Sequence, residues 1–286
     1  MTADWRHLFP FSPNHLDLDG HRLHYVDEGP RHGRPVLFVH GNPTWSFAWR
    51  ACISAVRETR RAIAPDHLGC GLSDKPKDGP YRLADRIAAL ERLVLALDLR
   101  DVTLVVHDWG GAIGFGMAAR HPDRIGRLVV TNTAAFRSRH MPWRIAAARV
   151  PGLGALAVRG LNGFSAAAMR MATAKGLGAD VTQGYLAPYD SWAHREAVLR
   201  FVEDIPTQHN HPSWPTLLDV EAGLAQFADR PAVIAWGELD WCFTPSYREE
   251  WQRRLPGAAV HRYEDAGHLL MEDAQDRLVS LIAGFA

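Results

Sequence analysis

The sequence is poor in cysteine and has no excess charge of either sign. Its three cysteines, Cys52, Cys70 and Cys242, are odd in number and lack metal-site spacing, which argues against a disulfide-stabilised extracellular protein. Lysine and arginine together number 32, as do aspartate and glutamate, so the formal net charge is zero. Such a chain lacks the diffuse basic field that holds nucleic acid or an anionic membrane. A small neutral ligand is favoured instead.

Long apolar segments are also missing. No stretch approaches the roughly 20 uninterrupted apolar residues that span a bilayer, because arginine and glycine interrupt the alanine-rich stretches. Residues 1–20 contain no basic segment followed by a continuous apolar one, so no secretory signal is predicted. We therefore expect a soluble, cytoplasmic protein with free thiols and no membrane span.

The sequence does contain a regular alternation of strand-like and helix-like stretches. With 286 residues, 47% of them hydrophobic, the chain is long enough for one large domain with an elaboration. From Gly20 to about Asn132 the alternation is typical of a parallel sheet covered by helices. Residues 21–29 alternate like an early edge strand. Further strands are expected at residues 34–41, 61–69, 101–107, 126–133 and 230–237.

Between about Ala134 and Pro215 this alternation stops. The chain there is a series of helix-like pieces, rich in alanine and arginine and broken by prolines and tryptophans. We therefore predict an α/β fold with a mostly parallel central sheet flanked by helices. Residues 1–134 and 215–286 would form the core, and residues 135–214 an inserted helical cap.

Four polar side chains follow apolar runs at the points where strands are expected to end. They are Asn42, Asp108, Asp240 and His268. Ligands of open α/β sheets bind at the carboxyl ends of the strands. These four residues are therefore the first candidates for a functional site.

Asp108 lies in the stretch VHDWGG, between a strand pattern and a helix pattern. Gly110 and Gly111 permit the sharp bend of a nucleophile elbow, which presents one side chain. Aspartate is also a common helix N-cap, so the turn alone leaves both interpretations open. The order nucleophile, acid, histidine along the chain, here Asp108, Asp240 and His268, favours a catalytic triad.

The acid of such a triad has two possible places. One follows the strand after the elbow strand, where this chain has Asn132 and no carboxylate. Asp240 therefore takes the role of orienting His268, although aspartate is also a frequent turn residue. A carboxylate at the elbow is already ionised at neutral pH and can displace a leaving group from an sp³ carbon, forming an ester. Histidine can then activate water against that ester or act on it in another way.

A leaving group needs hydrogen-bond donors. Asn42 offers a side-chain amide and Trp109 an indole N–H, and two such donors suit a halide or a developing carboxylate. Asn42 would also fit a turn and Trp109 simple packing. The glycines of residues 110–116 lack the acidic residue of a dinucleotide fingerprint. His209 and His211 have no third metal ligand nearby. No cofactor and no metal are expected.

Four stretches together resemble the haloalkane dehalogenase family of α/β-hydrolases over nearly the whole chain. They are HGNPTWSFAWR (residues 40–50), APDHLGCGLSDKP (64–76), VHDWGG (106–111) and DAGH (265–268). The resemblance implies an α/β-hydrolase fold with an inserted cap. It also implies that Asp108 is the nucleophile, His268 the base and Asp240 its partner. Asn42 and Trp109 match the family's contacts to the leaving group or oxyanion.

Stretches outside these motifs resemble one branch of that superfamily, the β-lactone decarboxylases of bacterial long-chain olefin biosynthesis. They are TNTAAF (residues 131–136), APYDSW (187–192), RFVEDIP (200–206) and FADRPAVIAWG (227–237). This resemblance implies a cis-3,4-dialkyl oxetan-2-one as substrate and a cis-alkene and carbon dioxide as products. It is compatible with association with other enzymes of olefin biosynthesis.

Apolar cap residues are candidates for holding the alkyl arms of such a substrate. They are Phe136, Trp143, Leu161, Phe164 and Met171. Each of them taken alone also fits simple packing, because methionine and aromatic side chains at helical spacing usually belong to a core.

Three other functions stay open from the residues alone. Haloalkane hydrolysis would use the same catalytic residues, with water activated by His268. Epoxide hydrolases usually have glycine where this chain has Val106, and they need two cap tyrosines, for which Tyr185 and Tyr189 are the available residues. A non-catalytic binding protein of this fold would have no need of a matched acid-base set.

Overall fold

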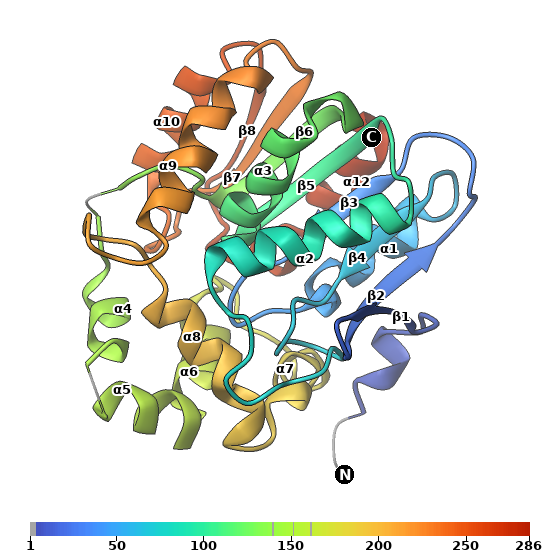
Figure 1. The fold of residues 1–286 in the computed structure, drawn as a ribbon. Helices are drawn as coiled ribbons and strands as arrows, with labels where there is room; N and C mark the ends of the chain where they lie inside the picture. Colours follow the sequence, from blue (N-terminus) through green and yellow to red (C-terminus); the bar gives the residue numbers. More distant parts are fainter. Residues whose placement is uncertain (1–3, 139, 151, 161) are drawn as a thin grey trace.

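One sheet of eight strands forms the centre of the molecule (Figure 1). The structure is a computed structural model that describes residues 4–138, 140–150, 152–160 and 162–286. The strand order is β1-β2-β4-β3-β5-β6-β7-β8; both pairings of β2 are antiparallel, and all pairings from β4 to β8 are parallel. The strands are β1 (Asn14–Leu18), β2 (His21–Glu28), β3 (Val36–Val39), β4 (Ala62–Pro65), β5 (Val102–Asp108), β6 (Ile125–Thr133), β7 (Ala232–Gly237) and β8 (Ala259–Tyr263).

Helices cover both faces of this sheet and one end of it. Those around the sheet are α1 (Arg50–Val56), α2 (Leu83–Ala96), α3 (Trp109–Arg120), α10 (Pro245–Arg254), α11 (Leu270–Asp273) and α12 (Gln275–Phe285). Those between β6 and β7 are α4 (Trp143–Ala148), α5 (Leu153–Ala155), α6 (Gly163–Met171), α7 (Ala179–Leu186), α8 (Glu196–Glu203) and α9 (Trp214–Gly223). Short 3-10 turns are η1 (Arg6–Leu8), η2 (Ser46–Trp49), η3 (Pro122–Arg124), η5 (Ala187–Tyr189), η6 (Ala193–Arg195) and η7 (Leu224–Phe227), and η4 (Leu156–Gly160) is π-helical. No helix in the described ranges is long and apolar enough to cross a membrane.

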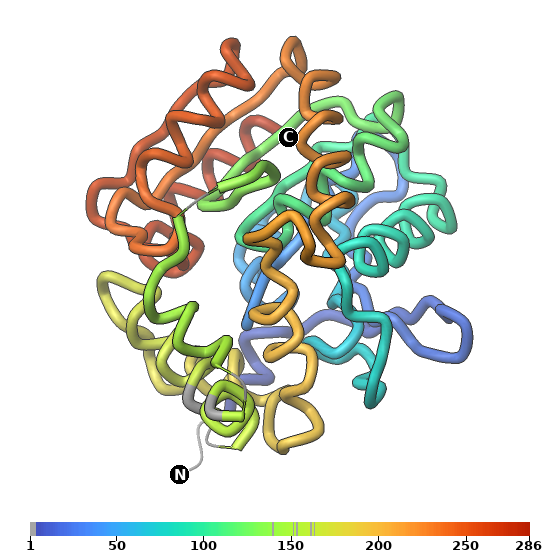
Figure 2. Tube along the Cα trace, turned by 60° about the vertical axis from the view of Figure 1, so that its left-hand side comes forward, coloured from blue at the N-terminus to red at the C-terminus, as the bar shows by residue number. Residues whose placement is uncertain are grey.

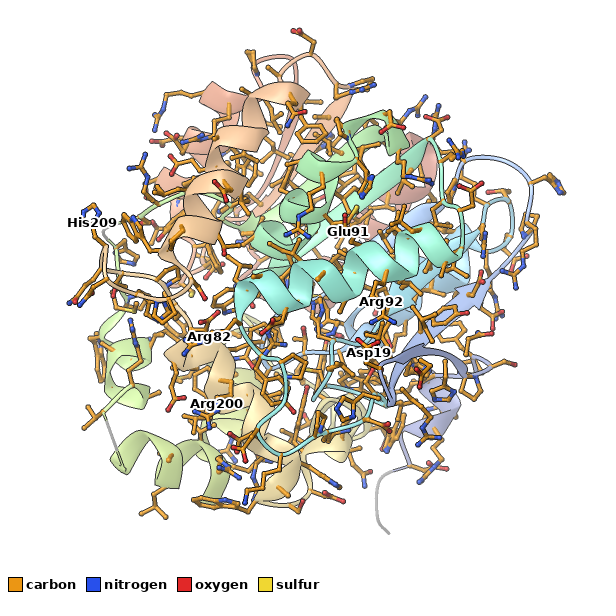
Figure 3. All side chains as sticks on the ribbon, in the orientation of Figure 1. Asp19, Arg82, Glu91, Arg92, Arg200 and His209 are labelled. Atoms are coloured by element: carbon orange, nitrogen blue, oxygen red, sulfur yellow. The ribbon has the colours of Figure 1, made fainter. Side chains whose placement is uncertain are left out.

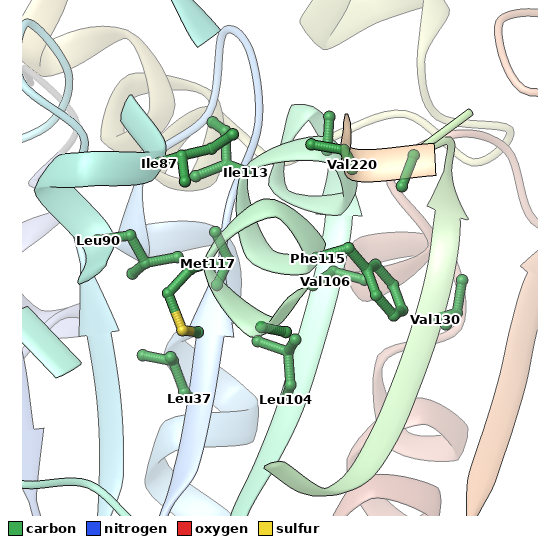
Figure 4. Close-up of a cluster of buried hydrophobic side chains, with 14 of the residues drawn as sticks. Leu37, Ile87, Leu90, Leu104, Val106, Ile113, Phe115, Met117, Val130 and Val220 are labelled. Atoms are coloured by element: carbon green, nitrogen blue, oxygen red, sulfur yellow. The ribbon is translucent and has the colours of Figure 1, made fainter. Parts of the chain in front are cut away.

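The core lies on both faces of the sheet. β3, β5 and β7 are buried along their whole lengths, as continuous apolar runs predict for strands covered on both sides. Side chains alternate along a strand, so Leu104 and Val106 face α2 and α3 (Figure 4), whereas Val105 packs in the cluster formed with α1 and α12. α2 forms because Ile87 and Leu90 recur at helical spacing and are buried together in that first cluster.

The strand predicted at residues 21–29 exists as β2, but the prediction that it forms the sheet edge is wrong. β1 lies outside it, joined by a turn at Asp19 and Gly20, both with positive φ. The reason is that β1 is short and half exposed, so its sequence NHLDL carries little apolar signal. Arg92 of α2 pairs with Asp19 at 2.6 Å, and the two lie side by side in Figure 3.

The segment between β6 and β7 contains the helices α4 to α9, and Figures 1 and 2 show α4 to α8 gathered at one end of the sheet. Side chains tie this segment to the loop after β3 and to α11. The Tyr189 hydroxyl donates to the Thr44 carbonyl at 3.1 Å, and the Tyr185 hydroxyl donates to Glu272 Oε1 at 2.6 Å. The arrangement agrees with an inserted helical cap, while its predicted limits at residues 135 and 214 stay a prediction.

Candidate active site

Asp108 ends β5 and directly precedes α3 in a strained turn. Its φ of 52° and ψ of −128° are rare for a residue other than glycine. The neighbouring glycines make the turn possible: a Cβ on Gly110 would lie 2.1 Å from the Val39 carbonyl oxygen, and one on Gly41 would overlap the Asp108 carboxylate. The elbow therefore presents Asp108 at the carboxyl end of the sheet.

His268 lies between the two carboxylates that the sequence singled out. Its Nε2 is 3.7 Å from Asp108 Oδ2, and its Nδ1 is 2.8 Å from Asp240 Oδ2. All three residues are buried. Because Asp240 is within hydrogen-bond distance of Nδ1, the Nδ1 proton is donated to it and Nε2 is left facing Asp108. The structure thus brings these three residues together, although Asp108 and His268 are 160 positions apart along the chain.

Asn132 holds the acid of this trio in place. Its Nδ2 donates to Asp240 Oδ2 at 2.9 Å, and its Oδ1 accepts from the Gly237 amide at 2.8 Å. The Cys242 amide donates to the other Asp240 oxygen at 2.7 Å. Asn132 occupies the place considered for a rival acid, and its position near the end of β6 is the sequence signal that points to it.

Burial and charge shift the pKa values of the trio in different directions. Burial raises the pKa of Asp108, and this is only partly offset by His268 and by the amides of Asn42 and Trp109. Burial opposes the ionised form of Asp240, but the His268 charge and hydrogen bond outweigh it, so the pKa of Asp240 is lowered. Burial likewise opposes charged His268, but Asp240 and then Asp108 raise the pKa of His268 overall. Asp240 is therefore ionised at neutral pH and favours a charged His268.

Two hydrogen-bond donors lie beside Asp108. The Asn42 backbone amide donates to Asp108 Oδ1 at 2.6 Å, and its side-chain Nδ2 donates one proton to the Val198 carbonyl at 3.3 Å. The second Nδ2 proton is left for a ligand. The indole ring of Trp109 packs on Phe201 with centroids 5.4 Å apart, and its N–H has no hydrogen bond to the described residues. Both side chains line the cavity described next.

A cavity of about 470 Å³ opens above the elbow. Asp108 and His268 are part of its wall, and most of the remaining wall is apolar. Several cap residues that face it are alanines, namely Ala147, Ala148, Ala157, Ala167 and Ala168. Such a space suits an apolar ligand whose reactive group reaches the carboxylate.

The predicted pocket residues divide into three groups. Phe136, Phe164 and Met171 line the cavity. Leu161 lies outside the described residues. Trp143 does not line the cavity, contrary to the prediction, because it is 74% exposed at the start of α4, while the next residue, Arg144, faces the cavity.

Two residues beside His268 were not predicted. The Phe243 ring stacks on the imidazole with centroids 5.7 Å apart and planes at 18°. His107 Nε2 donates to the His268 carbonyl oxygen at 2.9 Å. Burial, with the His268 charge second, lowers the pKa of His107 to about 3, so this imidazole stays neutral. The position of His107 before the elbow residue was visible in the sequence, but its partner was not.

The histidine pair in the proline-rich loop has ordinary contacts. His209 lies at the surface (Figure 3), with its ring 4.5 Å from that of Trp214, and His211 Nε2 approaches the Glu203 carbonyl at 3.2 Å. Within the described ranges, no group of three or more His, Cys, Asp or Glu side chains could hold a metal ion.

Comparison with known sequences gives a consistent set of relatives. A family model described as alpha/beta hydrolase fold matches residues 34–154 and 190–275. The cis-3-alkyl-4-alkyloxetan-2-one decarboxylase of Shewanella oneidensis is 42% identical over 285 residues, covering 97% of this chain and 89% of the relative. The enzyme of that name from Xanthomonas campestris is 42% identical over 289 residues, covering 97% and 96%. A haloalkane dehalogenase of Mycolicibacterium paratuberculosis is 31% identical, covering 96% and 92%.

Solved structures agree with the sequence comparison. The haloalkane dehalogenase DatA of Agrobacterium tumefaciens superposes with a TM-score of 0.85 at 26% identity, covering 96% of this chain and 95% of that one. The haloalkane dehalogenase DbeA of Bradyrhizobium elkani superposes with a TM-score of 0.85 at 27% identity, covering 96% and 98%. The likeness therefore extends over both the sheet and the inserted helices.

Proposed function

This chain belongs to the α/β hydrolase fold family, among the haloalkane dehalogenase-like enzymes, and we propose that it converts cis-3,4-dialkyl oxetan-2-ones (β-lactones) into a cis-alkene and carbon dioxide. The observation that carries this proposal is the 42% identity, over 97% of the chain, to two enzymes named for that reaction. The site supports it, because a buried carboxylate beside an apolar cavity suits attack on a neutral substrate with alkyl arms.

In the first proposed route, Asp108 attacks the ring carbon that bears the ring oxygen. A bond from Asp108 Oδ2 to that carbon forms while the carbon–oxygen bond of the ring breaks. The freed carboxylate is held by the N–H donors of Asn42 and Trp109. Its bond to the neighbouring carbon then breaks, and that electron pair forms the double bond as the ester to Asp108 breaks. Carbon dioxide and the alkene leave, Asp108 is a carboxylate again, and no water or proton is consumed.

In the second route, Asp108 attacks the lactone carbonyl. The acyl–oxygen bond breaks, leaving an anhydride with Asp108 and an alkoxide on the substrate. His268, whose pKa is raised because Asp240 and Asp108 outweigh burial, protonates that alkoxide to a hydroxyl. The bond between the acyl carbon and its neighbour then breaks, and its electron pair forms the double bond as hydroxide leaves. The hydroxide adds to the acyl carbon, so that carbon dioxide and the Asp108 carboxyl group separate and the proton returns to His268. The donors at Asn42 and Trp109 serve both routes, and both begin with a covalent bond to Asp108.

Haloalkane hydrolysis is the second candidate function. It is favoured by the dehalogenase relatives, which are 30–31% identical over 96% of the chain. Asp108 would displace the halide, Asn42 and Trp109 would hold it, and His268 would activate water against the resulting ester. The lactone and haloalkane reactions therefore share their first step and differ in whether water enters.

Two further alternatives have less support. An epoxide hydrolase needs phenol donors in the cavity, but the hydroxyls of Tyr185 and Tyr189 are bonded to Glu272 and to the Thr44 carbonyl, and neither side chain lines the cavity. A pure binding protein would not require the buried trio around His268.

Under this proposal the chain acts in olefin biosynthesis. Residues 135–214 would act as a cap that shields the alkyl arms from water. The apolar substrate favours direct transfer from another enzyme of the route, and a cytoplasmic location is expected. No cofactor is required by either route described above.

The proposal is tested with purified protein and a cis-3,4-dialkyl β-lactone, with the alkene measured by gas chromatography. We expect alkene from the wild type, none from Asp108→Ala, and wild-type amounts from Asp219→Ala, which removes an exposed carboxyl on α9. Thermal unfolding of each variant establishes that it is folded. If folded wild type forms no alkene but releases bromide from brominated alkanes, the decarboxylase assignment is wrong and the dehalogenase assignment holds.

A further inference from the structure

Trp143 and three residues of the cavity wall lie at one of the places where that wall reaches solvent. Arg144, Met171 and Trp241 line the cavity and are also in contact with solvent. Trp143, which precedes Arg144, is 74% exposed, and Met171 is 40% exposed. We call Trp143, Arg144, Met171 and Trp241 the rim.

The rim is held together by specific contacts. The Trp241 indole N–H donates to the Met171 carbonyl oxygen at 3.0 Å. The Arg144 guanidinium lies 5.3 Å from the ring centroid of Trp143 and 5.1 Å from that of Trp241. Two tryptophans with a cation between them therefore lie beside a part of the apolar cavity wall that reaches solvent.

Charge is distributed unevenly along the sequence that contains Arg144 and Met171. No aspartate or glutamate occurs between Asp123 and Asp180, although the whole chain has zero net charge. Arg144, Arg149 and Arg170 lie in this acid-free stretch, and none of the three forms an ion pair within the described residues. The neutrality of the chain as a whole thus conceals a basic stretch of sequence that contains Arg144 of the rim.

We propose that the rim is a docking site for a lipid surface that bears anionic headgroups. Tryptophan is enriched at the membrane–water interface, and an exposed tryptophan beside basic residues is the pattern of a protein that lies on that interface. Trp143 and Met171 enter the headgroup region. Arg144 binds the phosphates of the headgroups and adds attraction to an anionic surface.

Docking in this way places the cavity opening against the lipid. An apolar substrate then passes from the lipid into the cavity without crossing water, which removes the cost of exposing its alkyl surface. This inference goes beyond the proposed reaction, because binding to a lipid surface needs neither Asp108 nor a lactone. Failure of one therefore leaves the other standing.

The test is cosedimentation of the purified chain with vesicles. One set contains phosphatidylcholine alone and the other equal amounts of phosphatidylcholine and phosphatidylglycerol. We expect binding to the anionic vesicles that weakens as salt is added, and much weaker binding to the neutral ones. Arg144→Gln should weaken partitioning roughly fivefold, the effect of one basic side chain near an anionic surface. Trp143→Ser should weaken it at every salt concentration, because its contribution is apolar.

Matched variants distinguish the rim from the rest of the surface. Trp192→Ser removes another exposed tryptophan, 45% exposed and with Arg159 at 4.6 Å from its ring, that does not line the cavity. Arg92→Gln removes an arginine of α2. Both variants, and Asp108→Ala, should bind anionic vesicles as the wild type does.

Three results would overturn the proposal. The first is no binding of wild type to anionic vesicles. The second is unchanged binding of Trp143→Ser and Arg144→Gln, or an equal loss in Trp192→Ser. The third is absence of vesicle binding together with a larger species of the wild type in size-exclusion chromatography that Trp143→Ser abolishes. That result would assign the rim to contact with a second copy of the chain.

Discussion

Asp108 and His268 share a buried space in which each affects the ionisation of the other. The pKa of Asp108 is raised above its ordinary 3.8, chiefly by burial, and that of His268 is raised above its ordinary 6.5, because Asp240 and Asp108 outweigh burial. The two groups are close enough to titrate as a coupled pair. At the scale of the residue, the pH dependence of the reaction follows from this pair.

We expect kcat/KM for the lactone to fall as the pH is lowered through the raised pKa of Asp108. Only the carboxylate can attack carbon, and a raised pKa means that the inactive protonated form persists to a higher pH than for an exposed aspartate. The measurement is a pH profile of alkene formation by wild type. If the rate of alkene formation fell only at pH 3.8 or below, the raised pKa of Asp108 would be contradicted.

The same profile tests whether His268 acts as a base. Hydrolysis requires neutral His268, so its rate should decline below the raised pKa of that residue, above 6.5. Attack at the ring carbon followed by fragmentation requires no base, and charged His268 stabilises the carboxylates. We therefore expect bromoalkane hydrolysis, if present, to lose rate at a higher pH than alkene formation. If the rates for the lactone and the bromoalkane fell at the same pH, the fragmentation route that needs no water would be ruled out.

At the scale of the element, Asp273 at the end of α11 connects the His268 loop to the cap. Its Oδ2 accepts from the amides of Gly267 and Ala174, both at 2.8 Å, and its Oδ1 accepts from the amide of Lys175 at 3.0 Å. The Leu269 amide donates to the Ala172 carbonyl at 2.8 Å beside these bonds. The loop that bears the histidine and the segment after α6 are therefore held as one unit.

Asp273→Ala should loosen this unit and reduce kcat. The buried Gly267 amide would lose its acceptor at a cost of about 1–3 kcal/mol, and the position of His268 depends on the same loop. Hydrogen exchange should accelerate at residues 172–175 and 265–269, while Asp276→Asn, an exposed change on α12, should leave both exchange and turnover as in wild type. Faster exchange with unchanged kcat would show that the unit contributes stability without positioning His268.

At the scale of the whole molecule, the cavity exists because the inserted helices stand off the carboxyl ends of the strands. Alanines on the cap side, among them Ala168 of α6, leave the space that larger side chains would fill. The core of the sheet does not contribute such space, since buried side chains pack on both of its faces. Figure 4 shows the cluster on one face. The length of the accepted alkyl arms is therefore decided by the cap.

Ala168→Phe should shift the preference of the enzyme towards lactones with short alkyl arms. Removing room for a methylene group changes kcat/KM by roughly 10- to 200-fold, and the loss should grow with arm length. Ala166→Phe is the matched control, because Ala166 lies on α6 but does not line this cavity. Competition between lactones of different length, followed by gas chromatography, measures the shift. An equal loss for all lengths would mean that α6 was merely displaced.

Most of the sheet and the order of the candidate residues could be predicted from the sequence by itself. The run at 101–107 was found as β5 and the run at 230–237 as β7, because strands buried on both faces must be apolar along their length. The glycines after Asp108 mark the elbow locally, and chain order then indicates Asp240 and His268. β1 was missed because it has only five residues, of which Leu16 and Leu18 alone are apolar, too short a run for the alternation to stand out.

Only the tertiary structure decided which cap residues face the cavity. Trp143 and Arg144 are neighbours, and the choice of which one points inward depends on how α4 packs rather than on composition. The bond from Asn132 to Asp240 likewise joins residues 108 positions apart. α4 has six residues, too few for apolar periodicity to set its orientation, which depends instead on contacts that no local stretch of sequence contains.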